Sequence, residues 1–234
     1  MVQINGSNLN VRIKFTKTGA LQYISHLDLV RTMHKVVVRA KLPLWYTEGF
    51  NPKPKMVFAA PLSIGTESRT EFMDLRITKY VPEKEIIEAL NKNLTDEMRV
   101  IDAYYPETKL TDLKWLSYTI LVKTAKPCDG TLAECCERAL RSEIVEIEKK
   151  SKPGEAKKTV NIAPLIKSVN VAAVDNGLQI STCLSADQSS FLNPEYIISA
   201  LKNQCGILNS CDLISEYYSI MREFAYRDDM SEFR

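Results

Sequence analysis

The order in which hydrophobic patterns follow one another over residues 9–105 most constrains the fold. Apolar and polar residues alternate over Leu9–Phe15, which predicts a half-buried strand. Apolar residues then recur at helical spacing over Ser25–Ala40. Further patterns predict a short strand at 42–46, strands at 56–60, 71–77 and 99–105, and a second helix from Pro82 to Leu94. Apart from the short segment, the order strand-helix-strand-strand-helix-strand is that of a ferredoxin-like sandwich.

The second half of the chain varies the same order and has one element more. Strands are predicted at 115–123, 142–148, 169–174, 178–184 and 213–224, helices at 130–141 and 193–204, and an additional element at 160–166. Asn176-Gly177 predicts a tight hairpin, and the polar residues 149–159 predict a mobile hairpin loop. We therefore predict an α+β protein with two tandem ferredoxin-like (βαββαβ) sandwiches of antiparallel sheets, at residues 1–110 and 111–234.

The composition narrows the class of protein but not its activity. Apolar residues make up 45% and charged residues 26%, as in a soluble globular protein. The first ten residues lack the features of a secretory signal, and no apolar run is long enough to span a membrane. The six cysteines form no C-x-x-C pair, which favours small buried side chains with reduced thiols. We expect a cytoplasmic protein with no cofactor, no metal and no membrane partner.

Positive charge is concentrated near the start of the chain. Residues 12–55 contain nine basic residues against two acidic ones, a local balance of +7 in a chain whose net charge is only +2. Arg31, Lys35 and Arg39 recur every four residues on the outer side of the first predicted helix. Such a stretch attracts an anionic partner such as RNA, and the alternative interpretation is a solvated face without a ligand.

The start of that helix carries one of only two histidines. Ser25 is the expected N-cap, and Asp28 takes the place of the glutamate in a capping box. His26 falls in the first turn, where it either binds the backbone or contacts an anion or a reacting proton. His34 lies eight residues further on, and two histidines without a third ligand do not indicate a metal site.

A proline-rich loop over residues 45–55 combines aromatic rings, an amide and lysines. Tyr46, Phe50 and Asn51 suit contacts with bases, whereas Lys53 and Lys55 suit contacts with phosphates. The alternative is that the aromatic residues anchor the loop to the core and the lysines are merely solvated.

Several segments together resemble a known bacterial family. They are Arg12–Lys17, Ser25–Asp28, Arg39-Ala40, Gly49–Lys55, Pro61-Leu62 and Gly65. The combination resembles the radical-SAM-associated domain of unknown function, which occurs alone or fused behind a B12-binding radical-SAM protein. The resemblance implies a radical-SAM enzyme as a partner on a separate polypeptide. A looser similarity in fold is to the CRISPR repeat-processing endoribonucleases.

Three functional hypotheses follow. The leading one is a non-catalytic accessory module that binds RNA, or presents a substrate, to a radical-SAM enzyme in RNA modification. In it, Lys17, Arg31, Lys35, Lys53 and Lys55 contact phosphate, Tyr46, Phe50 and Asn51 contact bases, and His26 and Asp28 shape the mouth of the helix. The second is a metal-independent endoribonuclease with His26 as general base. The third is a protein-interaction module that docks onto the radical-SAM partner.

Overall fold

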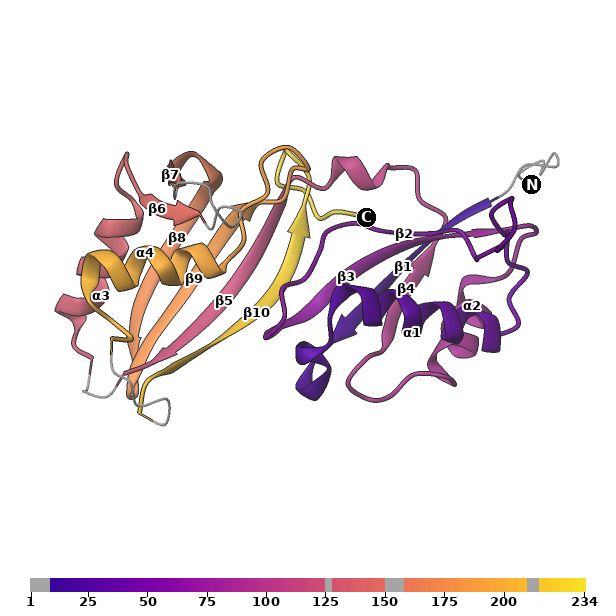
Figure 1. The fold of residues 1–234 in the computed structure, drawn as a ribbon, viewed down its shortest axis with the longest axis horizontal. Helices are drawn as coiled ribbons and strands as arrows, with labels where there is room; N and C mark the ends of the chain where they lie inside the picture. The colour runs from indigo at the N-terminus through magenta and orange to yellow at the C-terminus, as the bar shows by residue number, and fades with distance from the viewer. Residues whose placement is uncertain (1–8, 125–127, 150–157, 210–214) are drawn as a thin grey trace. The chain divides into compact units, whose positions relative to one another are not determined.

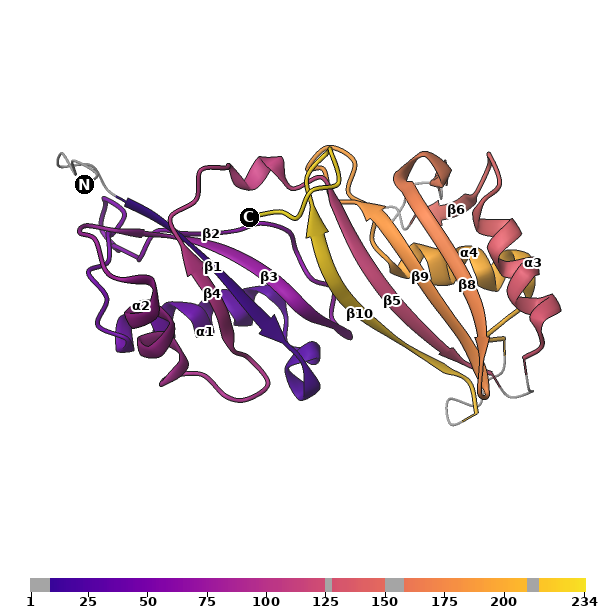
Figure 2. The ribbon, with the colours of Figure 1, turned by 180° about the vertical axis from the view of Figure 1, so that it is seen from behind.

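The computed structural model describes residues 9–124, 128–149, 158–209 and 215–234, which belong to two compact units. The first unit comprises the chain up to Leu113 together with Phe233 and Arg234, and the second comprises residues 114–232. The described residues form a mixed α+β protein with four α-helices and antiparallel sheets. Within each unit two helices cover one face of the sheet (Figures 1 and 2).

The first unit contains four strands and two helices in the predicted order. They are β1 (Leu9–Lys17), α1 (His26–Arg39), β2 (Met56–Phe58), β3 (Thr66–Ile77), α2 (Glu83–Asn91) and β4 (Val100–Tyr104), with short 3-10 turns η1 (Gly19–Tyr23) and η2 (Leu110–Asp112). Strand β1 lies between β4 and β3, and β2 pairs with the end of β3, all antiparallel. The predicted strand at 42–46 is wrong, because this segment forms only isolated bridges at Leu44 and Tyr46.

Strand β3 begins five residues earlier than predicted. Its added positions alternate between buried and exposed as in any half-buried strand, but the buried ones are Thr66, Ser68 and Thr70. An apolar pattern cannot reveal a strand whose inward residues carry hydroxyl groups.

The core of the first unit lies between the two helices and the sheet. The inner face of α1 contributes Leu29, Met33, Val36 and Val37, all nearly or fully buried. These side chains pack with alternate residues of β1 and β3, such as Ile13. Burial of each such side chain contributes about 1.5–3 kcal/mol to the stability of the fold. In the regularly paired stretch, from Leu9 to Phe15 of β1 and from Glu71 to Ile77 of β3, alternation directs the remaining residues to the helix-free face.

One of those residues, Arg12, is fully buried although it belongs to the basic stretch. Its Nε donates to Asp74 Oδ1 at 2.7 Å, and Nη2 donates to Asp74 Oδ2 at 3.1 Å. The guanidinium also donates to Thr108 and lies 4.8 Å from the centre of the Phe233 ring. Arg12 is therefore a structural residue whose charge is neutralised by Asp74.

The second unit contains four antiparallel strands in the order β10-β5-β9-β8 and a separate two-stranded ladder. Its elements are β5 (Trp115–Lys123), α3 (Gly130–Leu140), β6 (Glu146–Lys149), β7 (Lys158–Asn161), η3 (Ala163–Leu165), β8 (Ile166–Val174), β9 (Gly177–Ser185), α4 (Glu195–Cys205) and β10 (Tyr217–Tyr226). The additional element expected at 160–166 corresponds to β7 and η3, and β7 pairs with β6. Most of the predicted mobile loop, residues 150–157, lies outside the described residues.

The predicted hairpin at Asn176-Gly177 is confirmed, but Gly177 lies in the paired strand and not in the turn. Val174 pairs with Gly177, so the two-residue loop is Asp175-Asn176, and Asn176 adopts the left-handed conformation with φ of 62°. A Cβ on Gly177 would lie 2.0 Å from the carbonyl oxygen of Val122 in β5. Glycine is required here because the neighbouring strand approaches closely.

Candidate nucleic-acid interface

Helix α1 begins where the sequence predicts, and its cap engages two of the predicted site residues. Ser25 Oγ accepts a hydrogen bond from the Asp28 N–H at 3.1 Å and donates to Asp28 Oδ2 at 2.7 Å. Arg31 pairs with the other carboxylate oxygen at 3.3 Å. The Ser25 hydrogen bond, followed by Arg31, holds the pKa of Asp28 below its usual value. Asp28 thus stabilises the helix start and partly neutralises Arg31.

His26 is exposed in the first turn of α1. Its ring meets the ring of Phe58 edge to face, with centroids 5.4 Å apart. Within the described ranges of the chain, the imidazole makes no hydrogen bond or ion pair. The geometry therefore provides a packing role for His26 and no orienting partner for a general base.

The basic stretch is only partly available on the surface. Six of its nine cations are exposed, namely Arg31, Lys35, Arg39, Lys41, Lys53 and Lys55. Arg12 and Lys17 are buried, and Lys17 Nζ donates to the carbonyl oxygen of Gln22 at 3.3 Å. Lys17 thus holds the η1 segment from inside the protein, and the surface charge is lower than the sequence alone indicates.

Residues 45–55 form a small hairpin with an exposed aromatic tip. The Thr47 N–H donates to the Lys53 carbonyl at 2.9 Å, and the Lys53 N–H donates to Thr47 Oγ1 at 3.1 Å. Phe50 lies in the tip between these two residues and has a relative exposure of 112%, so its ring is fully in solvent. Tyr46 is 43% exposed at the base of the hairpin. The predicted loop is therefore a braced structure that presents an aromatic ring.

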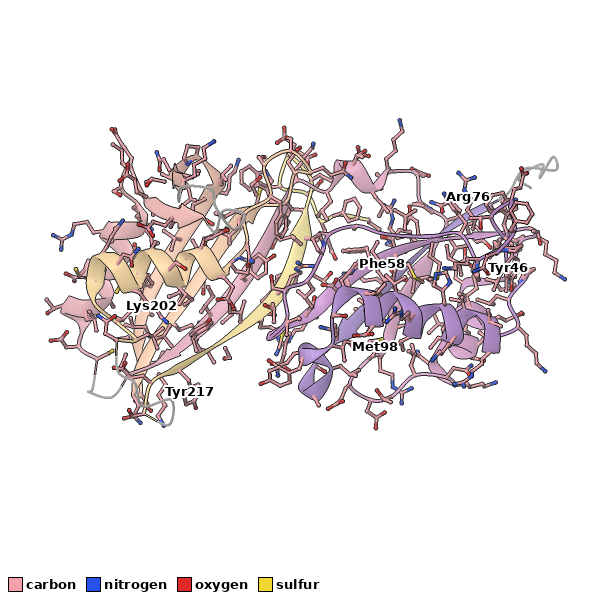
Figure 3. All side chains as sticks on the ribbon, viewed as in Figure 1. Tyr46, Phe58, Arg76, Met98, Lys202 and Tyr217 are labelled. Atoms are coloured by element: carbon pink, nitrogen blue, oxygen red, sulfur yellow. The ribbon has the colours of Figure 1, made fainter. Side chains whose placement is uncertain are left out.

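Three backbone hydrogen bonds close a ring at the base of this hairpin. The Lys55 N–H donates to the Trp45 carbonyl, the Trp45 N–H to the Arg76 carbonyl, and the Arg76 N–H to the Lys55 carbonyl, each at 3.0 Å. The Arg76 guanidinium also lies 5.9 Å from the centre of the Trp45 indole. Tyr46 and Arg76 accordingly lie at the same end of the first unit (Figure 3). The hairpin is anchored to the end of β3, which lowers the ordering cost of binding through it.

The predicted site residues fall into two groups along α1. Partial burial, and then the nearby charge of Lys53, lower the pKa of His34, so the hairpin lies close to the later part of the helix. His26 is at the opposite end, eight residues or about 12 Å from His34 along the helix axis. His34 and Lys53 thus lie near each other, whereas His26 and Asp28 belong to the first turn of the helix.

Arg76 is the residue of this surface that the sequence interpretation missed. Period-two alternation in β3 puts Arg76 on the same face as Asp74, away from the core, which is a weak signal for an exposed cation. Arg76 lies beside Lys55 because β2 pairs with β3. A local sequence pattern does not reveal which strands pair.

The cysteines that the structure describes lie in no cluster of potential metal ligands and differ in burial. No group of three or more potential metal ligands occurs among the residues that the structure describes. Burial raises the pKa of Cys136 to about 12 and that of Cys183 to about 11, as expected for buried thiols. Cys135, in contrast, is exposed, and Cys211 lies outside the described residues.

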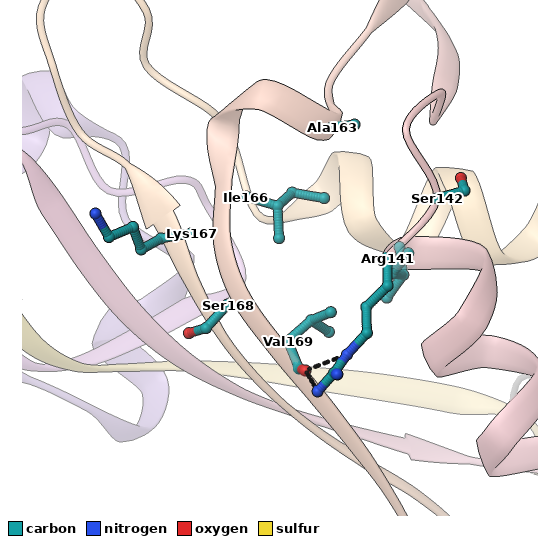
Figure 4. A pocket seen from close by; sticks show the side chains of 8 residues that line it. Arg141, Ser142, Ala163, Ile166, Lys167, Ser168 and Val169 are labelled. Atoms are coloured by element: carbon teal, nitrogen blue, oxygen red, sulfur yellow. Dashed lines mark hydrogen bonds between the residues drawn. The ribbon is translucent and has the colours of Figure 1, made fainter.

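A pocket of about 470 Å³ in the second unit lies between the end of α3 and β8 (Figure 4). Arg141 directs its guanidinium to the carbonyl oxygen of Val169, with distances of 3.2 and 2.9 Å, and pairs with Glu137 at 2.9 Å. Glu137 in turn accepts the Val171 N–H at 2.8 Å. Both charged side chains thus satisfy backbone groups at the edge of β8, which protects that edge. Lys167, which also lines the pocket, is exposed, and its Nζ lies 5.0 Å from the centre of the Trp115 ring.

Helices of the kind that cross membranes are absent from the described part of the chain, since none is both long and apolar enough.

Comparisons with known proteins identify a family without a known activity. No curated protein matches this sequence. One solved structure, "Crystal Structure of a Cbf5-Nop10-Gar1 Complex", contains a chain similar to it at 10% identity and a TM-score of 0.47. That similarity covers 94% of this chain and 50% of the other, so this chain spans about half the length of the similar chain. The similarity is too low to support an argument about function. Residues 10–194, most of the sequence, match the family described as "Uncharacterized protein conserved in bacteria (DUF2344)", and the chain belongs to this family.

Proposed function

We propose that this protein is an accessory module that binds single-stranded RNA, and so presents it to a separate radical-SAM enzyme for modification. The observation that carries the proposal is the fully exposed ring of Phe50 on a hairpin that is closed by backbone hydrogen bonds. An aromatic ring that buries nothing in its own protein does not stabilise the fold. Stacking on an unpaired base would bury the ring and contribute about 1–3 kcal/mol.

The residues around Phe50 support a nucleic-acid ligand. Asn51 is exposed next to the ring and offers an amide for base edges, and Tyr46 provides a second, half-exposed aromatic surface. Lys53 and Lys55 flank the tip on the returning arm, both exposed. Aromatic rings interleaved with lysines suit a single strand, since every base has a stacking face and every phosphate a charge.

Helix α1 extends this surface with further positive charge. Lys35 and Arg39 are exposed on its later turns, close to where Lys53 approaches His34. Neither Lys35 nor Arg39 pairs with a carboxylate among the described residues. These unpaired cations suit contacts with the phosphates of a single-stranded RNA whose bases reach the hairpin tip.

The proposal includes two tandem ferredoxin-like units as the scaffold. The two-helix, four-stranded organisation of each unit supports it, with β1 between β4 and β3 in the first and the order β10-β5-β9-β8 in the second. The radical-SAM partner rests on the resemblance of the Ser25–Asp28 and Gly49–Lys55 segments, and a cytoplasmic location belongs to the same proposal.

The first experiment is retention of single-stranded RNA by the purified full chain at 50 and 200 mM salt. We compare the unaltered chain with the double variant Lys35→Ala/Lys53→Ala and with the charge-matched control Lys84→Ala/Lys92→Ala, whose exposed lysines lie in α2 and at its C-cap. Each phosphate contact contributes about 0.7 to the slope of log affinity against log salt for single strands. We expect the first variant to lower the slope by about 1.4 and the control to leave it unchanged.

The alternatives predict different results in the same samples. Absence of retention at 50 mM salt refutes the RNA-binding proposal. Capture of a radical-SAM protein that resists high salt and nuclease supports the protein-docking hypothesis, since phosphate contacts weaken as salt rises. Cleavage in EDTA that disappears in His26→Ala supports the endoribonuclease.

A further inference from the structure

The helix-free face of the sheet in the first unit carries a second group of cations beside the hairpin. A pocket of about 280 Å³ opens there, and its lining includes Lys55, Arg76 and Lys109, as well as the carboxylate of Asp74. All three cations are exposed. The pocket is smaller than the roughly 300–1,000 Å³ sites that enclose a drug-sized ligand, so it suits a small group.

Strand pairing explains why two of these cations meet. Met56 of β2 pairs with Leu75 of β3, and the Arg76 N–H bonds to the Lys55 carbonyl, which extends the same ladder by one position. Paired residues on neighbouring strands point to the same face, and successive residues point to opposite faces. Because Leu75 is buried in the core, Lys55 and Arg76 point together to the helix-free face.

Two like charges opposite each other destabilise a sheet, by up to about 1 kcal/mol in the range known for cross-strand pairs. The one acidic side chain that lines the pocket does not relieve this repulsion. Asp74 already accepts hydrogen bonds from Arg12 at 2.7 and 3.1 Å and from Asn10 at 2.8 Å. Both of its oxygens are occupied and its charge is neutralised by Arg12.

Lys109 adds a third charge from the segment that borders the pocket. The backbone N–H of Lys109 donates to Asp112 Oδ2 at 2.9 Å, which fixes the backbone of this segment. Within the described ranges, Lys55, Arg76 and Lys109 form no ion pair with a carboxylate. The pocket therefore has three uncompensated positive charges, and one of them, the Arg76 guanidinium, is held beside the Trp45 indole.

We propose that this pocket binds a phosphomonoester, the terminal phosphate of the RNA strand that the hairpin binds; this inference rests on the proposed function. A phosphomonoester carries about −1.5 to −2 at pH 7, whereas each phosphodiester carries one negative charge, so the terminal group matches three cations better. The planar fork of Arg76 can contact two phosphate oxygens, and the lysines supply point charges. Lys55 links the pocket to the hairpin, so a strand that ends in the pocket has its adjacent bases near Phe50.

The test compares one short single-stranded RNA in three forms: 5′-phosphorylated, 3′-phosphorylated, and with hydroxyl groups at both ends. Dissociation constants are measured with the full chain at one salt concentration. We expect one phosphorylated form to bind about tenfold more tightly than the hydroxyl form, the equivalent of one charge-assisted hydrogen bond. Lys109→Ala should abolish this preference while leaving the hydroxyl form unchanged, Lys109→Arg should keep it, and the control Lys84→Ala should have no effect.

The outcomes separate this inference from the proposed function. Equal binding of all three forms by the unaltered chain, with RNA binding intact, overturns the phosphate pocket alone. Weakening of all three forms to the same extent by Lys109→Ala also overturns it, because Lys109 would then contact the strand generally. If no RNA binds, the proposed function fails. Lys109-dependent binding of AMP would then support the pocket with a free nucleotide as its ligand, and Lys109-dependent binding of inorganic phosphate would support it with free phosphate as its ligand.

Discussion

Replacing Phe50 by alanine tests the exposed hairpin tip most directly. The ring is fully in solvent, so the substitution removes no buried contact from the folded protein. We expect the free energy of unfolding to change by less than about 0.5 kcal/mol. For a chain of this size that corresponds to a shift in Tm of less than about 2 °C.

The effect on RNA binding should be much larger than the effect on stability. Loss of one base stack removes about 1–3 kcal/mol. At 1.4 kcal/mol per factor of ten, the dissociation constant should rise about 5- to 150-fold. The salt dependence should not change, because Phe50→Ala removes no charge, and this separates the ring from the lysines.

Fluorescence anisotropy with a labelled single-stranded RNA at two salt concentrations measures both quantities, and a thermal melt measures stability. Phe50→Trp should retain affinity because it keeps a stacking face, while Phe50→Leu should lose it despite its apolar side chain. If Phe50→Leu binds as tightly as the unaltered chain, the ring is not a stacking platform. An unchanged affinity in Phe50→Ala removes the hairpin tip from the interface altogether.

Three other predictions concern the fold. Asp74→Ala should lower the free energy of unfolding by about 3–5 kcal/mol in urea titration, because it leaves Arg12 buried without its anion; a loss below 1 kcal/mol would mean that other groups neutralise the guanidinium. Gly177→Ala should destabilise the second unit by about 1–3 kcal/mol, since its Cβ would lie 2.0 Å from a carbonyl oxygen. The control Gly130→Ala, with nothing within 4 Å of its Cβ, should not destabilise it, and equal effects would contradict the steric explanation. Cys136, with a pKa of about 12, should resist a thiol reagent at pH 8 until the chain is unfolded, as peptide mass spectrometry would show; rapid labelling of the native chain would show that its burial is transient.

Elements that depend on neighbours in sequence were predicted well. Helix α1 begins one residue after Ser25, as its cap indicates, and β5 has the bounds that its alternation predicts. Helix α4 begins at Glu195, one residue later than predicted, with Pro194 at the N-cap in place of Asn193, but Asn193 Oδ1 still accepts the Glu195 N–H at 3.1 Å. In each case the determining interaction spans four residues or fewer, so the sequence contains all the partners.

The functional surface was predicted less completely, because its residues depend on distant partners. Phe50 and Lys53 do lie together on the hairpin, since proline and glycine confine such residues to a turn. Arg76 and Lys109 were missed, because only strand pairing and the course of residues 108–110 bring them to Lys55. Lys17 was assigned to the surface because a basic residue in sequence gives no indication of whether it is covered.

The sequence by itself thus determined the order of strands and helices and the position of an aromatic, lysine-rich turn, because periodicity, capping and turn chemistry are local. The tertiary structure decided which charges remain available. Arg12 is buried because Asp74, 62 residues away, neutralises it, whereas Lys55 and Arg76 stay exposed without an anion. Removing a charge from water is unfavourable unless a partner compensates it, and that partner is found only after the strands have paired.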